Sequence, residues 1–94
     1  MKPQYQELAK TAKAIANAER LQIIDILLKG ETNVSKINES IKISQPALSQ
    51  HLAKLRHAHI VGTRRDARQI FYYINNTDVV RLVGLIKETH RKAA

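Results

Sequence analysis

The chain has 94 residues, enough for one domain and too few for two, and 44% of them are hydrophobic, as in a folded protein. Its formal net charge of +8 favours a polyanionic partner, nucleic acid ahead of an anionic membrane surface. The absence of cysteine excludes disulfides and thiolate metal sites, and no apolar stretch approaches a membrane span or a signal-peptide core. We therefore expect one cytoplasmic domain over residues 1–94.

The first third of the chain predicts two helices. Residues 5–16 repeat apolar side chains at the spacing of one helix face, and residues 18–29 are apolar on most sides, which is typical of a central, buried helix. Asn17 is the expected N-cap of the second helix, and Gly30 ends it.

Two further helices follow with a short connection between them. A helix is predicted over residues 34–41, with Asn33 as its cap, and another begins after Ser44, whose side chain caps it, with Pro46 in the first turn. The inward face of this fourth helix carries Leu48, Leu52 and Leu55. Two helices joined by about three residues are the helix-turn-helix arrangement, here over about residues 34–58.

After Ile60 the apolar period changes from that of a helix to that of a strand. Residues 61–65 and 69–74 predict two strands around a turn at 66–68, and a fifth helix is expected to start at Thr77 as its cap. A hairpin after a helix-turn-helix is the wing of a winged helix, here over about residues 60–74. The predicted fold is therefore mainly α with a β-hairpin wing (α+β), with five helices and two strands.

The chemistry of the fourth helix favours duplex DNA. Gln45 and Gln50 can each make a bidentate pair with adenine, and Ser44 and Ser49 can donate to phosphates or bases. Lys54 is better placed for the phosphate backbone than for bases. Charge is concentrated in this half of the chain, because residues 42–74 hold six lysines and arginines against one acidic residue.

The wing carries three arginines at or near its tip. Arg64, Arg65 and Arg68 suit phosphate contacts or a narrow minor groove. A solvated hairpin with a charged turn is the alternative interpretation. The position directly after a helix-turn-helix favours the DNA-binding one.

Three segments resemble the ArsR/SmtB family of bacterial repressors. The strongest is SQPALSQHLAKLR, residues 44–56, which is similar to the family's recognition helix, and Glu19-Arg20-Leu21 and Ile60-Val61 support it. The segment LSQHL of the fourth helix and the segment RRDARQIFY of the wing are most similar to the HlyU, BigR and NolR branch of the family. The resemblance covers about residues 8–90.

The resemblance implies a homodimer built from the first and last helices, about residues 4–16 and 77–91. It also implies a set of DNA-facing residues on the fourth helix and the wing. His51 flanks the leucine stripe, so a packed or phosphate-bonded role stays open beside a DNA-facing one. The implied set is Ser44, Gln45, Pro46, Ser49, Gln50, His51, Arg64, Arg65, Arg68 and Gln69.

The sensing residues of the family are missing. Where some members have a Cys-x-Cys pair, this chain has Asn33 and Ser35, and a dithiol switch would need cysteine where Asp25 stands. In the second family metal site only Asp78 is retained, because the other positions hold Val80, Arg91 and Ala94. We therefore predict no metal and no cofactor, and any effector is unknown.

Two histidines near the end of the fourth helix form a His57-x-His59 pair. No further ligand stands at metal-binding spacing, so solvated or phosphate-facing histidines are the favoured interpretation. His59 also stands where the family usually has a helix-ending glycine. A left-handed conformation there is tolerable for histidine but mildly costly, and a slightly altered helix end is the alternative.

The prediction for function is a sequence-specific homodimeric repressor that binds an imperfect palindrome in double-stranded DNA. The alternatives are a non-specific nucleoid-type binder and a winged-helix module that binds protein. An enzyme is not expected, because the chain lacks a cysteine nucleophile, a glycine-rich phosphate loop and suitably spaced carboxylates.

Overall fold

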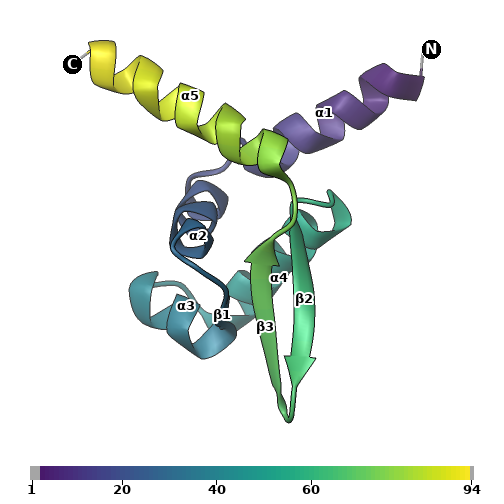
Figure 1. Ribbon diagram of the computed structural model, residues 1–94, viewed down its shortest axis with the longest axis vertical. Coiled ribbons are helices and arrows are strands. Elements are labelled where there is room, and N and C mark those ends of the chain that lie inside the picture. Colours follow the sequence, from purple (N-terminus) through teal and green to yellow (C-terminus); the bar gives the residue numbers. More distant parts are fainter. Residues whose placement is uncertain (1–2, 94) are drawn as a thin grey trace.

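The computed structural model describes residues 3–93 (Figure 1). Five helices pack with a small antiparallel sheet that lies at one side of them, and the hairpin of the last two strands projects from the helices. In chain order the elements are α1 (Pro3–Ile15), α2 (Ala18–Leu28), β1 (Thr32–Asn33), α3 (Val34–Ser40), α4 (Gln45–His57), β2 (Val61–Asp66), β3 (Gln69–Ile74) and α5 (Thr77–Ala93).

The helix starts depend on side-chain caps. The expected caps of α2 and α4 are confirmed, because Asn17 Oδ1 accepts the N–H of Arg20 at 3.0 Å and Ser44 Oγ accepts that of Ala47 at 3.2 Å. For α5 the expectation was wrong by one residue. Asn76 Oδ1, rather than the side chain of Thr77, accepts the N–H of Val79, at 3.1 Å.

The sheet has three strands in the order β1-β3-β2, one more than the sequence predicted. The additional strand, β1, has two residues that pair with Tyr72 and Phe71 of β3. Two residues are too few to show an alternating pattern, so β1 exists only because β3 lies beside it. The other two strands are those expected, with β2 one residue longer.

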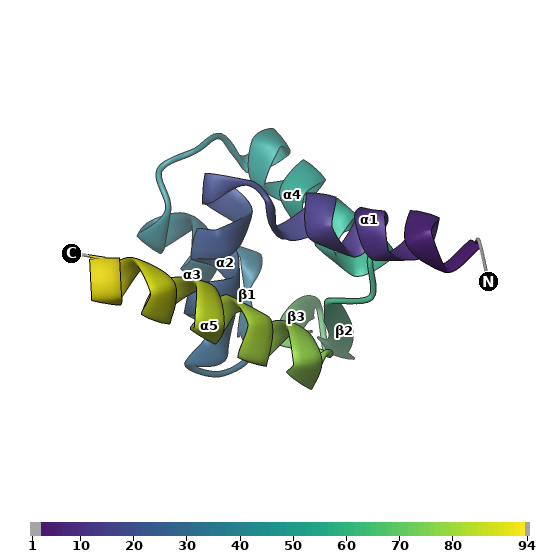
Figure 2. The same ribbon diagram turned by 90° about the horizontal axis from the view of Figure 1, so that it is seen from above.

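The core lies around α2. Ile23 and Ile24 of this helix are fully buried, together with the leucine face of α4 and with Val79 and Val83 of α5. The outer helices add little else to the core, since α1 buries only Ala14 and Ile15 among its described side chains. Both outer helices, α1 and α5, extend away from the body, and seen from above their outer ends lie on opposite sides of the molecule (Figure 2).

The end of α4 fixes how the wing leaves the helices. His59 has a φ of 60°, so of the two alternatives left open for this position the structure has the left-handed conformation. His59 N–H donates to Arg56 O and Ile60 N–H donates to Leu55 O, each at 3.0 Å, which is the pairing of a Schellman motif. Leu55 and Ile60 are both fully buried, so the helix end is anchored in the core.

Candidate nucleic-acid interface

The connection between α3 and α4 is held from inside by Asn38. Its Nδ2 donates to the carbonyl oxygens of Ile41, at 3.2 Å, and Ile43, at 3.0 Å. These bonds satisfy two turn carbonyls and fix the angle at which α4 leaves α3. Sequence reasoning did not identify Asn38, because an asparagine in the middle of a short helix gives no local signal for contacts three and five residues ahead.

The two faces of α4 differ completely in burial. Leu48, Leu52 and Leu55 are at most 1% exposed and attach the helix to the core. The predicted contact residues of α4 other than His51 lie exposed, so the helix presents one polar surface to solvent. These residues, with the cap, are Ser44, Gln45, Pro46, Ser49, Gln50 and Lys54.

His51 points to a different partner. Its Nδ1 lies 3.1 Å from Nη1 of Arg20, which is buried, and Arg20 also donates from Nε to Ala14 O at 2.6 Å and from Nη2 to Lys13 O at 3.2 Å. Arg20 therefore joins the C-terminal end of α1 to the recognition helix. This link spans 31 residues, so sequence reasoning could not assign it.

The same contact sets the protonation of His51. An arginine can only donate, so Nδ1 of His51 must accept, and the ring is neutral with its proton on Nε2. Burial, and then the positive charge of Arg20, lowers the pKa of His51 below its ordinary value of 6.5. Glu19 opposes this shift and Lys54 adds to it.

The arginines of the wing fall into two groups. The guanidinium of Arg64 makes three hydrogen bonds to the carboxylate of Glu31, from Nε to Oε1 at 3.1 Å and to Oε2 at 3.3 Å, and from Nη2 to Oε1 at 2.5 Å. It also lies 4.8 Å from the ring centre of Phe71. The bonds to Arg64 hold the pKa of Glu31 below its ordinary value. Gln69 is also engaged, because its Oε1 accepts from Asn33 Nδ2 at 2.9 Å.

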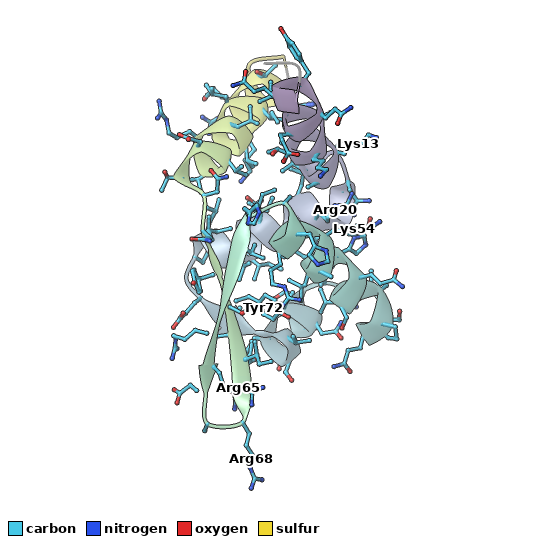
Figure 3. All side chains as sticks on the ribbon, turned by 90° about the vertical axis from the view of Figure 1, so that its right-hand side faces the viewer. Lys13, Arg20, Lys54, Arg65, Arg68 and Tyr72 are labelled. Atoms are coloured by element: carbon cyan, nitrogen blue, oxygen red, sulfur yellow. The ribbon has the colours of Figure 1, made fainter. Side chains whose placement is uncertain are left out.

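Arg65 and Arg68 are exposed, and neither makes an ion pair within the described part of the chain. Arg65 pairs with Ile70 across the hairpin, so by strand alternation it lies on the sheet face of Val61 and Tyr72, which packs toward the helices. Arg68 lies in the turn at the tip (Figure 3). Of the predicted arginines, these two are available to a ligand.

Residues 3–93 contain no group of three metal-binding side chains, and no described helix is long and apolar enough to cross a membrane. Asp25, which stands at the dithiol position, accepts from Lys87 Nζ at 2.6 Å. An ion pair therefore joins α2 to α5 at this point.

The family model for bacterial regulatory proteins of the arsR family matches residues 17–63, half of the chain. The transcriptional activator HlyU of Vibrio cholerae is 41% identical over 86% of this chain and 75% of its own length. The biofilm growth-associated repressor of Xylella fastidiosa strain Temecula1 is 36% identical over 92% of this chain and 75% of its own.

Two solved structures are similar to the fold. NolR of Sinorhizobium fredii superposes with a TM-score of 0.87 at 39% identity, covering 94% of this chain and 88% of that one. The homodimeric winged helix-turn-helix DNA-binding domain Mb0332 of Mycobacterium bovis superposes with a TM-score of 0.88 at 31% identity, covering 97% and 84%. The winged helix-turn-helix fold is thereby confirmed.

These findings agree with the segments that the resemblance rested on, which lie mostly within the matched region. The relatives are named as transcriptional regulators, the class of protein that the sequence predicted. This chain, a winged helix-turn-helix transcriptional regulator, therefore belongs to the arsR family of bacterial regulatory proteins.

Proposed function

We propose that this chain is a homodimeric repressor that binds an imperfect palindrome in duplex DNA. The observation that carries the proposal is the exposed polar face of α4, which stands beside a wing whose Arg65 and Arg68 have no ion-pair partner in the described chain. In a dimer, two such helices about 34 Å apart enter successive major grooves.

Within this interface the residues have different roles. Gln45, Ser49 and Gln50 read base edges, since their side chains are exposed along one side of α4. Lys54, Arg65 and Arg68 neutralise phosphates or enter the minor groove. Arg64, Gln69 and His51 already have protein partners, and we assign them to holding the wing and α4 in place.

The outer helices support the homodimer. Tyr5 is 77% exposed, Leu8 63% and Leu85 66%, so α1 and α5 present large apolar side chains that the described chain does not cover. A second copy would bury these side chains at about 25 cal/mol for each Å² removed from water. A domain of this size also gains most from such added burial, because its own core is small.

We infer repression from the same geometry. A bound dimer covers promoter DNA and excludes polymerase without a further partner. HlyU of Vibrio cholerae is called an activator and the Xylella fastidiosa relative a repressor. A promoter–reporter fusion to the bound site decides between them, because deletion of the regulator raises expression under repression and lowers it under activation.

The first test is selection from a random duplex library, followed by binding of the enriched sequence and a scrambled duplex at fixed salt. We expect an inverted repeat that is bound about a thousandfold better than the scrambled DNA. Equal binding to both duplexes would instead identify a non-specific nucleoid-type binder. No DNA affinity, together with salt-independent binding of a partner protein, would support a module that binds protein.

Two variants test the separate roles of base reading and phosphate contact. Gln50→Ala should weaken the free energy of binding to the selected site by about 1–3 kcal/mol and change binding to scrambled DNA little. Arg65→Ala should weaken both duplexes alike and reduce the salt dependence. Gln22→Ala and Lys29→Gln, exposed positions on and after α2, are the matched controls. The assignment of roles is wrong if both variants weaken the two duplexes equally.

The dimer interface is tested by sedimentation. Leu85→Glu places a charge on the apolar surface of α5, and we expect a monomer. Leu28→Glu alters a leucine that is 42% exposed at the end of α2, so this control should stay dimeric. A dimer of undiminished stability with Leu85→Glu would exclude this face of α5 from the interface.

A further inference from the structure

A basic hollow lies where the end of α1 and the start of α2 meet the last turn of α4. Its volume is about 470 Å³. Figure 3 shows Lys13, Arg20 and Lys54 gathered in this region, far from the arginines at the wing tip. The lining contains no acidic residue, and its polar side chains are Lys10, Lys13, Arg20, Lys54 and His57.

The positive charges of the hollow are largely uncompensated. Lys13 and Lys54 make no ion pair among the described residues, and Lys10 has only an exposed contact with Glu7 at 3.5 Å. Such an exposed pair neutralises little charge. The guanidinium of Arg20 has no carboxylate partner either, because its donors go to two carbonyls and to His51.

Backbone carbonyls at the two helix ends beside the hollow already have donors within the chain. The last carbonyls of a helix carry the negative end of its dipole, and Arg20 covers those of Lys13 and Ala14 at the end of α1. At the end of α4, the carbonyl of Lys54 accepts from the N–H of Ala58 at 3.1 Å. The small side chains of Ala14 and Ala58 line the rest of the hollow and leave room between the cations.

The hollow also stays open in the proposed dimer. At about 100° per residue, Lys10 and Lys13 each lie about 140° or more around α1 from Leu8. From Tyr5, Lys10 lies about 140° away and Lys13 about 80°. A partner packed over Leu8 therefore leaves both lysines free to face a ligand.

We propose that this hollow binds a phosphate group. Three lysines and a histidine from two helices offer several N–H donors to one tetrahedral anion, and each ammonium acts as a compact point charge. The phosphate comes either from the DNA backbone or from a free phosphorylated compound. The first of these sources rests on the proposed DNA binding, whereas the second does not.

The first experiment titrates the full chain with inorganic phosphate at constant ionic strength and follows ¹⁵N-labelled amides by NMR. Saturable shifts around Ala14 and Ala58 are expected, with an affinity at least tenfold weaker in Lys13→Gln. Lys29→Gln removes the same charge from the end of α2, outside the hollow, and should bind phosphate like the unaltered protein.

The second experiment measures how duplex affinity falls with salt. A dimer carries two hollows, so Lys13→Gln should reduce the slope of log affinity against log salt by about 1.8. Between about 50 and 200 mM salt this corresponds to about 12-fold less weakening than in the unaltered protein. Lys29→Gln should leave the slope unchanged.

The two readouts separate the sources of the phosphate. A reduced slope assigns the site to a DNA backbone phosphate, and saturable phosphate binding with an unchanged slope assigns it to a free anion. The proposal is overturned if phosphate produces no saturable shifts around the hollow and Lys13→Gln matches Lys29→Gln on DNA. If no DNA is bound at all, the proposed function fails while the phosphate titration still tests the site.

Discussion

Arg20→Leu would remove the one charged side chain that is buried among those described, while a leucine keeps much of the apolar bulk of its stem. The substitution abolishes three hydrogen bonds, to Ala14 O at 2.6 Å, His51 Nδ1 at 3.1 Å and Lys13 O at 3.2 Å. It thereby detaches the end of α1 from α4. We expect a large loss of stability, together with a looser recognition helix.

The magnitude follows from how well water can replace each bond. A hydrogen bond from a charged donor contributes about 1.5–3 kcal/mol. The bond to Ala14 O is buried and counts in full, whereas those to Lys13 O and His51 are only part-buried, so water restores much of them. The expected decrease in the free energy of unfolding is about 3 kcal/mol, a large share of the total for a small domain.

The assay is urea denaturation followed by circular dichroism at fixed protomer concentration, because dimerisation makes stability depend on concentration. Arg20→Lys retains one donor group and should lose an intermediate amount. Arg56→Leu changes an exposed arginine of α4 and should stay within about 0.5 kcal/mol. A loss below about 1 kcal/mol for Arg20→Leu, or an equal loss for Arg56→Leu, would refute the reasoning.

Three further predictions concern single side chains. The pKa of His51 is lowered on folding, so the unfolded chain binds more protons below pH 6.5 and the free energy of unfolding falls as the pH is lowered through that region. His51→Asn should reduce this pH dependence in urea titrations, and Gln22→Ala, at an exposed position of α2, should leave it unchanged. Ala67 has a φ of 58°, so Ala67→Gly should relieve backbone strain and raise the free energy of unfolding by about 0.5–1 kcal/mol. The melting temperature should rise with it, and an unchanged or lower melting temperature would contradict the strain. Glu31→Gln should free Arg64 for a phosphate contact and so tighten binding to scrambled DNA at low salt; unchanged binding would mean that Arg64 does not reach the duplex. The free energy of unfolding should change little, because the Arg64 and Glu31 side chains are both more than a third exposed.

The sequence by itself determined the features that depend on neighbours in the chain. The leucine stripe of α4 and the caps at Asn17 and Ser44 follow from contacts within a few residues, so pattern and composition were enough. The polar face of the recognition helix follows from the same periodicity.

Only the tertiary structure decided which of the predicted site residues are available to a ligand. Arg64 and Arg65 are adjacent in sequence, yet the pairing of β2 with β3 turns them to opposite faces, where Glu31 engages only the first. His51 similarly meets Arg20 across 31 residues. Contacts between distant segments depend on the packing of whole elements, and no local pattern of residues contains that information.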